Sequence, residues 1–332
     1  MAPCLRHAAG APWALARLAA ATLAAASVTG GHSAAAMPAM MMRSVSPHGA
    51  LAGSPHVAMS ATTRGSVKEV VSAEQATAWL LEHRDPRHPL PSEEFLQRNT
   101  QFAMRAREEL PAAATVPMKL FLSDVLPYLQ VDEPLDEWRP SFYQVLAPHA
   151  QAATLQKVAE AVVPMVWSAL RASPEVMANE PKSTPVVFRA NCTPQVMAPI
   201  SETLKAGYAS CTGCSILVAD ALRSVGVPAR VVGTPLWNVA GGGNHNWVEV
   251  WTGEGEHGGW HFFDAVPAET VEWDRAWFVP GNTQAAEAGT MSGIYAPVWD
   301  KAMADAVYPY TWRHPSETWP AVDRTAFYKS LQ

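Results

Sequence analysis

Residues 209–233 read ASCTGCSILVADALRSVGVPARVVG, and this stretch decides the fold. Ser210 is a residue type that caps helix N-termini, and the residues after it keep an apolar helical pattern as far as Gly226. From Val227 the pattern changes to the β-rich run VPARVVGT. We therefore expect a helix that begins at Cys211 and leads directly into a strand.

Two more strands are predicted shortly afterwards. In residues 245–251 (HNWVEVW) the Trp and Glu residues fall on one face and the valines on the other, the two-residue period of a strand. Residues 260–264 (WHFFD) form a third strand after the glycine-rich turn at 253–259. Because short loops join the three strands, the sheet is predicted to be antiparallel, with the preceding helix packed on it. This arrangement is an α+β fold.

The half of the chain before this region is predicted to be mostly helical. We place a helical N-terminal region at residues 69–180, in which Ser72 and Ser92 have the surroundings of helix N-caps. Residues 117–147 are rich in proline and aromatic residues, and we expect them to be irregular. This region has no pattern that indicates chemistry.

A core is predicted at residues 181–274, followed by an extension at 275–332. At the start of the core, residues 181–192 have room for a short strand. Thr193-Pro194 then predicts a helix that runs to Gly207, with threonine as the cap and proline in the first turn. The extension is rich in aromatic residues and proline, shows little regular pattern and is expected to pack on the core.

The first 68 residues have the composition of a targeting segment. They contain no acidic residue and five basic ones. A short apolar stretch at 12–29 behind a basic start, followed by small residues, is typical of a secretory signal peptide. The Ser- and Arg-containing remainder favours an organellar transit peptide or a two-part leader, and a disordered N-terminus is the third alternative. We expect an exported or organellar protein.

The rest of the chain is acidic. It holds 19 of the 24 basic and all 30 acidic residues, a formal charge of −11. With no basic stripe, we predict no nucleic-acid partner. After the leader no stretch approaches the roughly 18 apolar residues of a membrane span, so no integral span is expected in the mature chain. The sequence gives no signal for an oligomeric state.

Three residues form the candidate catalytic group. Cys211 lies where a helix begins, and the free N–H groups and partial positive charge there lower a thiol pKa and can stabilise an oxyanion. His245 opens a strand and can act as acid and base towards the thiol. Asp264 ends the neighbouring strand and can orient the imidazole. A thiol, an imidazole and a carboxylate are the parts of an activated cysteine nucleophile.

Other interpretations of the cysteines stay open. A helix cysteine is often a small buried hydrophobe, which is the reading we favour for Cys214. Cys211 and Cys214 also form a CTGC pair that could be redox-active. A zinc site would need further ligands from His245, His257 or His261, whose spacing matches no recognisable pattern. With Cys192, three cysteines remain after the leader, an odd number that does not predict a disulfide framework.

The combined motif resembles the transglutaminase-like superfamily over roughly residues 185–270. The resemblance lies in ASCTGCSILVADALRSVGVPARVVG, GNHNWVEVW and GWHFFDAVP. It places Cys211 at the nucleophile, His245 at the histidine and Asp264 at the third member, and it implies a papain-like fold. In this chain Ala265-Val266 follow the aspartate, where the family often has proline directly.

The resemblance also limits the branch of the family. The helical N-terminal half does not look like the β-sandwich of the animal crosslinking enzymes, and no acidic cluster resembles their calcium sites. It therefore implies a bacterial-type, calcium-independent member that needs no cofactor and no metal. The Cys211 amide, Asn191 and Gln195 are candidates for oxyanion binding, and Trp237 and Trp247 are candidates for walls of the cleft or for core packing.

The function expected from these residues is cysteine-dependent acyl transfer. Cys211 would attack a carbonyl of a peptide bond or glutamine-type amide, His245 would protonate the departing amine, and water or an amine would resolve the thioester. The expected partner is a peptide or protein substrate, and hydrolysis is favoured over transamidation. The alternatives are a catalytically silent peptide-binding module of the same fold and a CxxC redox or metal protein.

Overall fold

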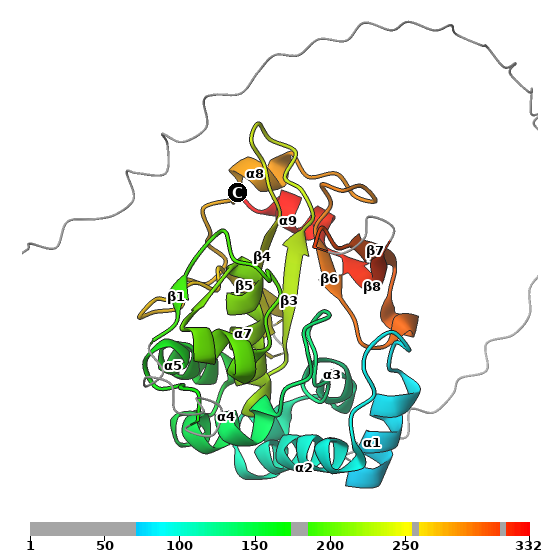
Figure 1. Cartoon of the computed structure of the whole chain (residues 1–332), viewed down its shortest axis with the longest axis vertical. Coiled ribbons are helices and arrows are strands. Elements are labelled where there is room, and N and C mark those ends of the chain that lie inside the picture. The colour runs from blue at the N-terminus through cyan, green and yellow to red at the C-terminus, as the bar shows by residue number, and fades with distance from the viewer. Residues whose placement is uncertain (1–70, 174–184, 254–258, 313–316) are drawn as a thin grey trace, which may run out of the picture. The chain divides into compact units, whose positions relative to one another are not determined.

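The computed structural model describes residues 71–173, 185–253, 259–312 and 317–332 (Figure 1). All of them belong to one compact unit, Glu69–Gln332. The predicted leader at 1–68 lies outside the described residues, as do His257 and most of the turn before the third strand. Within the described part of the chain, no helix is long and apolar enough to cross a membrane. The architecture is α+β, as predicted.

A six-stranded antiparallel sheet forms the centre, in the order β5-β4-β3-β6-β8-β7. Its strands are β3 (Ala229–Thr234), β4 (His245–Trp251), β5 (Trp260–Phe263), β6 (Tyr295–Pro297), β7 (Ala306–Pro309) and β8 (Thr318–Asp323). The first three are the strands expected from sequence. The other three come from residues 275–332, where the sequence shows little regular pattern. These strands have three to six residues and each contains a proline, so their alternation is too short to recognise.

The helix α7 (Cys211–Ser224) begins at the predicted residue. Ser210 has extended backbone angles and its hydroxyl accepts a hydrogen bond from the Gly213 N–H, which makes it the N-cap. After the helix, Gly226 adopts a φ of +75°, and a Cβ there would come within 2.5 Å of the Ala113 side chain. Both the left-handed backbone and the close approach therefore favour glycine.

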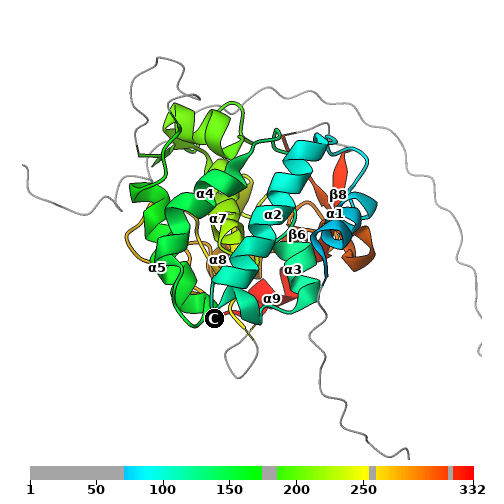
Figure 2. The same ribbon diagram turned by 90° about the horizontal axis from the view of Figure 1, so that it is seen from below.

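Helix α7 lies between the sheet and the helices of the N-terminal half. Figure 2 shows α2, α3, α4 and α5 side by side across the lower end of the molecule. The α-helices of this half are α1 (Ala73–Glu82), α2 (Glu93–Glu109), α3 (Met118–Asp124), α4 (Trp138–Leu146) and α5 (Leu155–Ser168). Because α4 and α5 contact α7 on one side and β3 and β4 contact it on the other, 13 of its 14 residues are buried. Cys211 is the exception, at the end that reaches the surface.

The capping predictions at Ser72 and Ser92 are confirmed, and Ser72 forms a complete capping box. The prediction of an irregular stretch at 117–147 is wrong, because α3 and α4 lie within it. The prolines there do not oppose helices: Pro117 precedes the first residue of α3, and Pro140 lies in the first turn of α4. Proline lacks an N–H, and the first-turn N–H groups of a helix have no intrahelical acceptor.

The segment before α7 departs from the predicted helix at 193–207. A short helical turn, η3, begins only at Pro199 and has the π form (Pro199–Leu204). Ala198 is extended, as expected of a residue that precedes proline, so no helix can pass through it. The short strand expected at 181–192 is present as β1 (Val187–Phe188), which pairs in parallel with β2 (Tyr208–Ala209).

The remaining short elements complete the unit. They are the 3₁₀ turns η1 (Ala113–Thr115), η2 (Ala147–His149) and η4 (Lys301–Met303) and the helices α8 (Gly281–Gln284) and α9 (Thr325–Ser330).

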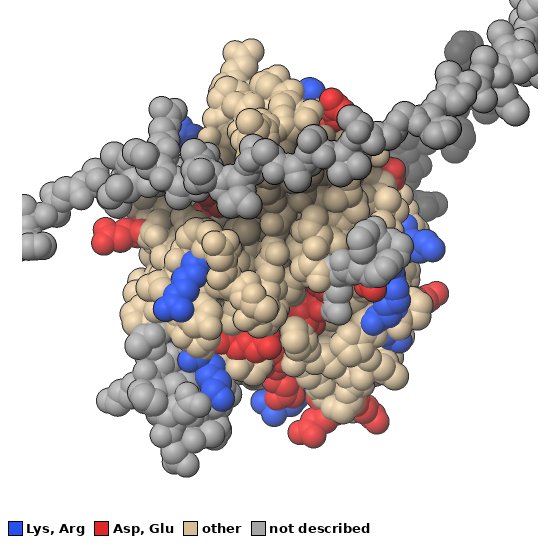
Figure 3. Space-filling view, turned by 45° about the horizontal axis from the view of Figure 1, so that its top comes forward, with Lys and Arg blue, Asp and Glu red and all other residues tan. Residues whose placement is uncertain are grey.

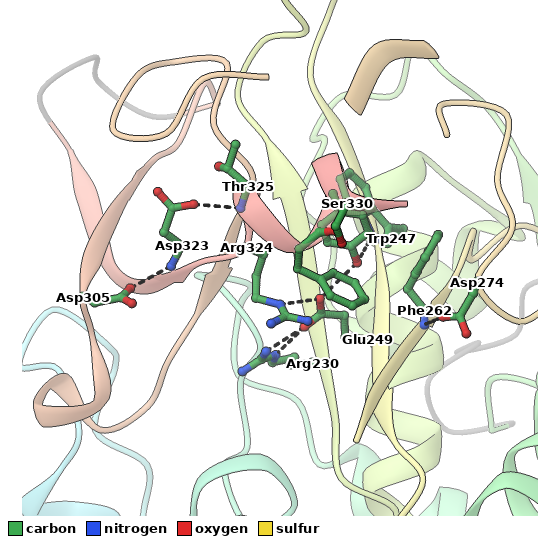
Figure 4. Close-up of polar contacts among 12 residues, drawn as sticks. Arg230, Trp247, Glu249, Phe262, Asp274, Asp305, Asp323, Arg324, Thr325 and Ser330 are labelled. Carbon is green, nitrogen blue, oxygen red and sulfur yellow. Dashed lines mark hydrogen bonds and ion pairs between the residues drawn. The ribbon is translucent and has the colours of Figure 1, made fainter. Parts of the chain in front are cut away.

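A buried ionic cluster joins α9 to the sheet (Figure 4). The fully buried Glu249 of β4 accepts hydrogen bonds from Arg230 Nε and Nη2 at 2.9 and 2.7 Å and from Arg324 Nε at 2.8 Å. The Tyr328 hydroxyl donates to the same carboxylate at 3.0 Å. Burial raises the pKa of Glu249, but the two guanidinium groups outweigh it and lower the pKa below its ordinary value. Glu249, the glutamate of the HNWVEVW stretch, is thus part of the framework.

Candidate active site

The fold brings Cys211, His245 and Asp264 together from three elements. Cys211 is the first residue of α7, His245 is the first of β4, and Asp264 follows β5 directly. Helix α7 packs on β4, and β4 pairs antiparallel with β5, so the start of β4 lies beside the end of β5. The Nε2 atom of His245 is 3.1 Å from Asp264 Oδ1. These are the three residues that the sequence proposed as a triad.

The ring of His245 is oriented for a thiol. Since Nε2 faces Asp264, the other ring nitrogen, Nδ1, is left for Cys211, with which the imidazole also hydrogen-bonds. Burial lowers the pKa of His245, but the hydrogen bonds and negative charges of Asp264 and Cys211 outweigh it and raise the pKa to about 9. At neutral pH the His245 ring is therefore expected to be protonated, as an imidazolium.

The thiol of Cys211 is shifted in the opposite direction. Burial raises its pKa, but a hydrogen bond and the positive charge from His245 outweigh burial, together with hydrogen bonds from the Asn246 backbone N–H and the Thr212 side chain. The net pKa lies below the ordinary thiol value. A lowered thiol pKa beside a raised imidazole pKa favours a thiolate–imidazolium pair, which is the reactive form of a cysteine nucleophile.

Gln195 lies beside the start of α7, whereas Asn191 does not. The Gln195 Nε2 donates to Thr212 Oγ1 at 3.2 Å, and the Gln195 carbonyl accepts a hydrogen bond from the Ser210 hydroxyl at 2.8 Å. Asn191 is exposed, and no side-chain hydrogen bond joins it to α7 within the described residues. Of the two side chains proposed for oxyanion binding, only Gln195 is held next to Cys211.

The two tryptophans proposed as cleft walls are buried behind the imidazole. Trp247 is fully buried and stacks on His245 at a ring distance of 5.7 Å, and Trp237 stacks on Trp247 at 5.9 Å. Trp247 packs against the buried face of the His245 ring, and Trp237 packs against Trp247. The exposed aromatic at the site is Trp277, 60% exposed and 5.3 Å from the His245 ring. Sequence reasoning missed Trp277, because an aromatic in the irregular run DRAWF has no periodicity that indicates exposure.

The loop that leads into His245 lines an uncharged cavity. A cavity of about 690 Å³ is lined by residues 236–242, in the loop that leads into His245, and by residues 290–292, and all of these lining residues are uncharged. The exposed side chains of Leu236, Val239 and Met291 are among them. Figure 3 turns this end of the molecule towards the viewer, and most of the surface that it shows uncovered is uncharged, with Lys, Arg, Asp and Glu side chains mostly towards the sides and lower part of the view.

The remaining cysteines give no separate site. Cys192, Cys211 and Cys214 are all free thiols, and burial raises the pKa of Cys214 far above that of Cys211. Cys214 is fully buried one helical turn beyond Cys211, in agreement with core packing. Within the described ranges, no group of three or more His, Cys, Asp or Glu residues is arranged to hold a metal ion.

The comparison with protein families agrees with this geometry. The model described as the transglutaminase-like superfamily matches residues 182–265, which include Cys211, His245 and Asp264. This segment of the chain belongs to that superfamily, as its motifs indicated. A search of curated proteins found no match for the chain.

Proposed function

We propose that this protein is a cysteine-dependent acyl-transfer enzyme that acts on a peptide bond or a glutamine-type amide. The observation that carries the proposal is the oppositely shifted Cys211–His245 pair, with His245 held by Asp264 at 3.1 Å. A thiolate at the start of a helix and an imidazolium beside it are the two groups that acyl transfer from an amide requires.

The first half of the proposed reaction forms a thioester. The Cys211 thiolate attacks the substrate carbonyl carbon, and the negative charge moves to the carbonyl oxygen. The Cys211 backbone N–H and the second Nε2 hydrogen of Gln195, the one not donated to Thr212, are the proposed donors to this oxygen. The carbon–nitrogen bond then breaks as His245 Nδ1 gives its proton to the leaving amine, and Asp264 keeps the imidazole oriented throughout.

The second half releases the acyl group. Neutral His245 accepts a proton from water, or from a primary amine, as that nucleophile attacks the thioester carbonyl. The carbon–sulfur bond breaks and the thiolate is restored beside the imidazolium. Water gives hydrolysis and an amine gives transamidation. We favour hydrolysis, because the cavity lined by residues 236–242 and 290–292 has no acidic side chain to hold a cationic amine, and the imidazole already engages Asp264.

The proposed substrate is an uncharged, partly apolar peptide segment. Among the described residues, ten large apolar side chains are exposed, and six of them lie in segments that flank the triad. The six are Val187, Phe188, Leu236, Val239, Trp277 and Met291. Exposed apolar groups that gather around reactive side chains favour a binding surface for apolar side chains of a substrate.

The proposal is tested with the full mature protein and two general probes. Iodoacetamide labelling of Cys211 is followed by mass spectrometry against pH in the wild type and in His245→Ala. Dimethylated casein is then incubated with and without a fluorescent primary amine: new peptide termini, or ammonia release without amine incorporation, indicate hydrolysis, and amine incorporation indicates transamidation. We expect labelling well below the free-thiol pKa of about 8.5, slowed by His245→Ala, and turnover that Cys211→Ala abolishes. Slow labelling, at the same rate in the wild type and in His245→Ala, would instead indicate a catalytically silent peptide-binding module.

A further inference from the structure

A line of four hydrogen-bonded side chains runs from the C-terminal strands to the start of α7. Gln195 Nε2 lies 3.2 Å from Thr212 Oγ1, Thr212 Oγ1 lies 2.8 Å from Asn246 Oδ1, and Asn246 Nδ2 lies 2.8 Å from the Tyr308 hydroxyl. The four residues come from the loop before η3, from α7, from β4 and from β7. Thr212 directly follows Cys211, so the line passes beside the nucleophile.

The interior of this line is sealed from water. Thr212, Asn246 and Tyr308 are each fully buried. A buried polar group without a partner costs roughly 1–3 kcal/mol. The hydrogen bonds among these three residues avoid that cost. Their mutual bonds connect the side chain next to Cys211 to β7, the strand at the opposite edge of the sheet from β5.

Gly233 on β3 has no side chain, and this leaves space for the Asn246–Tyr308 hydrogen bond. Gly233 pairs with Asn246 in the β3–β4 register. A Cβ at Gly233 would lie 2.2 Å from Asn246 Nδ2 and 2.7 Å from the Tyr308 hydroxyl. A side chain at this position would therefore displace the Asn246–Tyr308 contact.

The hydrogen bonds of the line can point in two directions, depending on the orientation of the Asn246 amide. In the first, Gln195 donates to Thr212, Thr212 to Asn246 and Asn246 to Tyr308, which leaves no Thr212 proton for its contact with Cys211. The Tyr308 hydroxyl proton then has no acceptor among the described residues. An amide turned by 180° presents its Nδ2 to Thr212 and its Oδ1 to Tyr308 in the same space. In that orientation Tyr308 donates to Asn246, Asn246 donates to Thr212, and the Thr212 proton is free for Cys211.

We propose that Tyr308, acting through Asn246, is a positioning residue that directs the Thr212 hydroxyl proton to the Cys211 thiolate. The inward orientation gives the Tyr308 proton an acceptor, and it adds a donor to the nucleophile when its charge appears. The Thr212 side chain is among the groups that lower the pKa of Cys211, which agrees with this direction. The inference rests on the proposed function of Cys211 as a nucleophile.

The test compares the pH midpoint of iodoacetamide labelling at Cys211 in four variants of the full chain. Thr212→Val removes the final donor, and we expect the midpoint to rise by about one unit. Tyr308→Phe removes only the distant hydroxyl, and we expect a rise of roughly half a unit. If Tyr308 acts through Thr212, the double variant has the midpoint of Thr212→Val alone. Tyr310→Phe is the matched control, because the buried Tyr310 hydroxyl makes no hydrogen bond within the described residues, and its ring packs on Tyr308.

The outcomes separate this inference from the proposed function. An ordinary thiol midpoint in the wild type, indifferent to His245, overturns the nucleophile itself. A low wild-type midpoint that Tyr308→Phe leaves unchanged, or shifts that add in the double variant, overturns the relay alone. Where Tyr308→Phe fails to fold, Asn246→Ser, a smaller side chain that cannot span the distance from Thr212 to Tyr308, provides the same comparison.

Discussion

The imidazole Nε2 of His245 lies 3.1 Å from Asp264 Oδ1, across the pair formed by β4 and β5. This contact fixes which ring nitrogen faces the carboxylate and leaves Nδ1 to Cys211. It also contributes to the raised pKa of His245, about 9, because the imidazolium has a negative partner on each side. One contact thus sets both the orientation and the protonation of the acid–base group.

Replacing Asp264 by asparagine tests this relationship. The variant keeps the size of the side chain but removes its charge, so the pKa of His245 falls from about 9 and less thiolate–imidazolium pair is present at neutral pH. We expect kcat/KM on a peptide substrate to fall roughly 10²–10⁴-fold. Casein turnover and iodoacetamide labelling at neutral pH measure it. The control is Asp274→Asn, which alters the separate pair of Asp274 with His261 on β5. Equal activity in wild type and Asp264→Asn would remove the aspartate from the mechanism.

The pH dependence of turnover follows from the two shifted groups. Activity needs Cys211 as thiolate, so it rises as the pH passes the thiol pKa, which lies below its ordinary value. It also needs His245 as a proton donor, so it falls as the pH passes about 9, where the imidazolium loses its proton. We expect a bell-shaped profile of kcat/KM, and an alkaline limb that moves to lower pH in Asp264→Asn. A rate that keeps rising above pH 10 would contradict the assigned role of His245.

The sequence predicted the candidate triad because each of its residues stands at the end of a regular element. Cys211 follows a clear cap, and His245 opens a seven-residue strand with clean alternation. Tyr308 and Trp277 were beyond prediction for a physical reason. The Asn246–Tyr308 bond spans 62 residues and joins β4 to a strand of four residues, and no local pattern encodes such a contact.

The same limit applies to the second half of the sheet. β6 pairs with β3 through Gly233 and Tyr295, residues far apart in the chain, and Pro297 ends it after three residues. Aromatic and proline content signalled packing at 275–332 but not pairing, because pairing of short strands is decided by partners distant in sequence. The framework outside β3–β5 therefore became visible only in three dimensions.

Trp277 is expected to bind substrate without taking part in the chemistry. Its ring is 60% exposed and lies 5.3 Å from the His245 ring. We predict that Trp277→Ala raises KM for apolar peptides roughly five- to thirtyfold, since loss of one aromatic contact costs about 1–2 kcal/mol. The rate of iodoacetamide labelling should stay near the wild-type value.

Leu90→Ala is the matched control for Trp277, because Leu90 is 66% exposed between α1 and α2, away from the triad. Its KM should not change. If Trp277→Ala and Leu90→Ala behave alike towards a peptide with a large apolar residue and towards one with an acidic residue, Trp277 does not contact substrate.

The stability of the sheet is expected to depend on Glu249. Glu249→Gln removes the charge that balances Arg230 and Arg324 and leaves two guanidinium groups facing a neutral amide. Since breaking a buried pair costs about 3–5 kcal/mol, we expect the free energy of unfolding to fall by that amount in guanidinium titrations. The control Glu269→Gln changes an exposed carboxylate and should stay within about 0.5 kcal/mol of wild type. The variant Arg324→Gln leaves the bond between Glu249 and Arg230 intact. We therefore expect a larger fall in the free energy of unfolding in Glu249→Gln than in Arg324→Gln. The reverse order would place the main support of the sheet in the C-terminal contact and not in the β3–β4 pair.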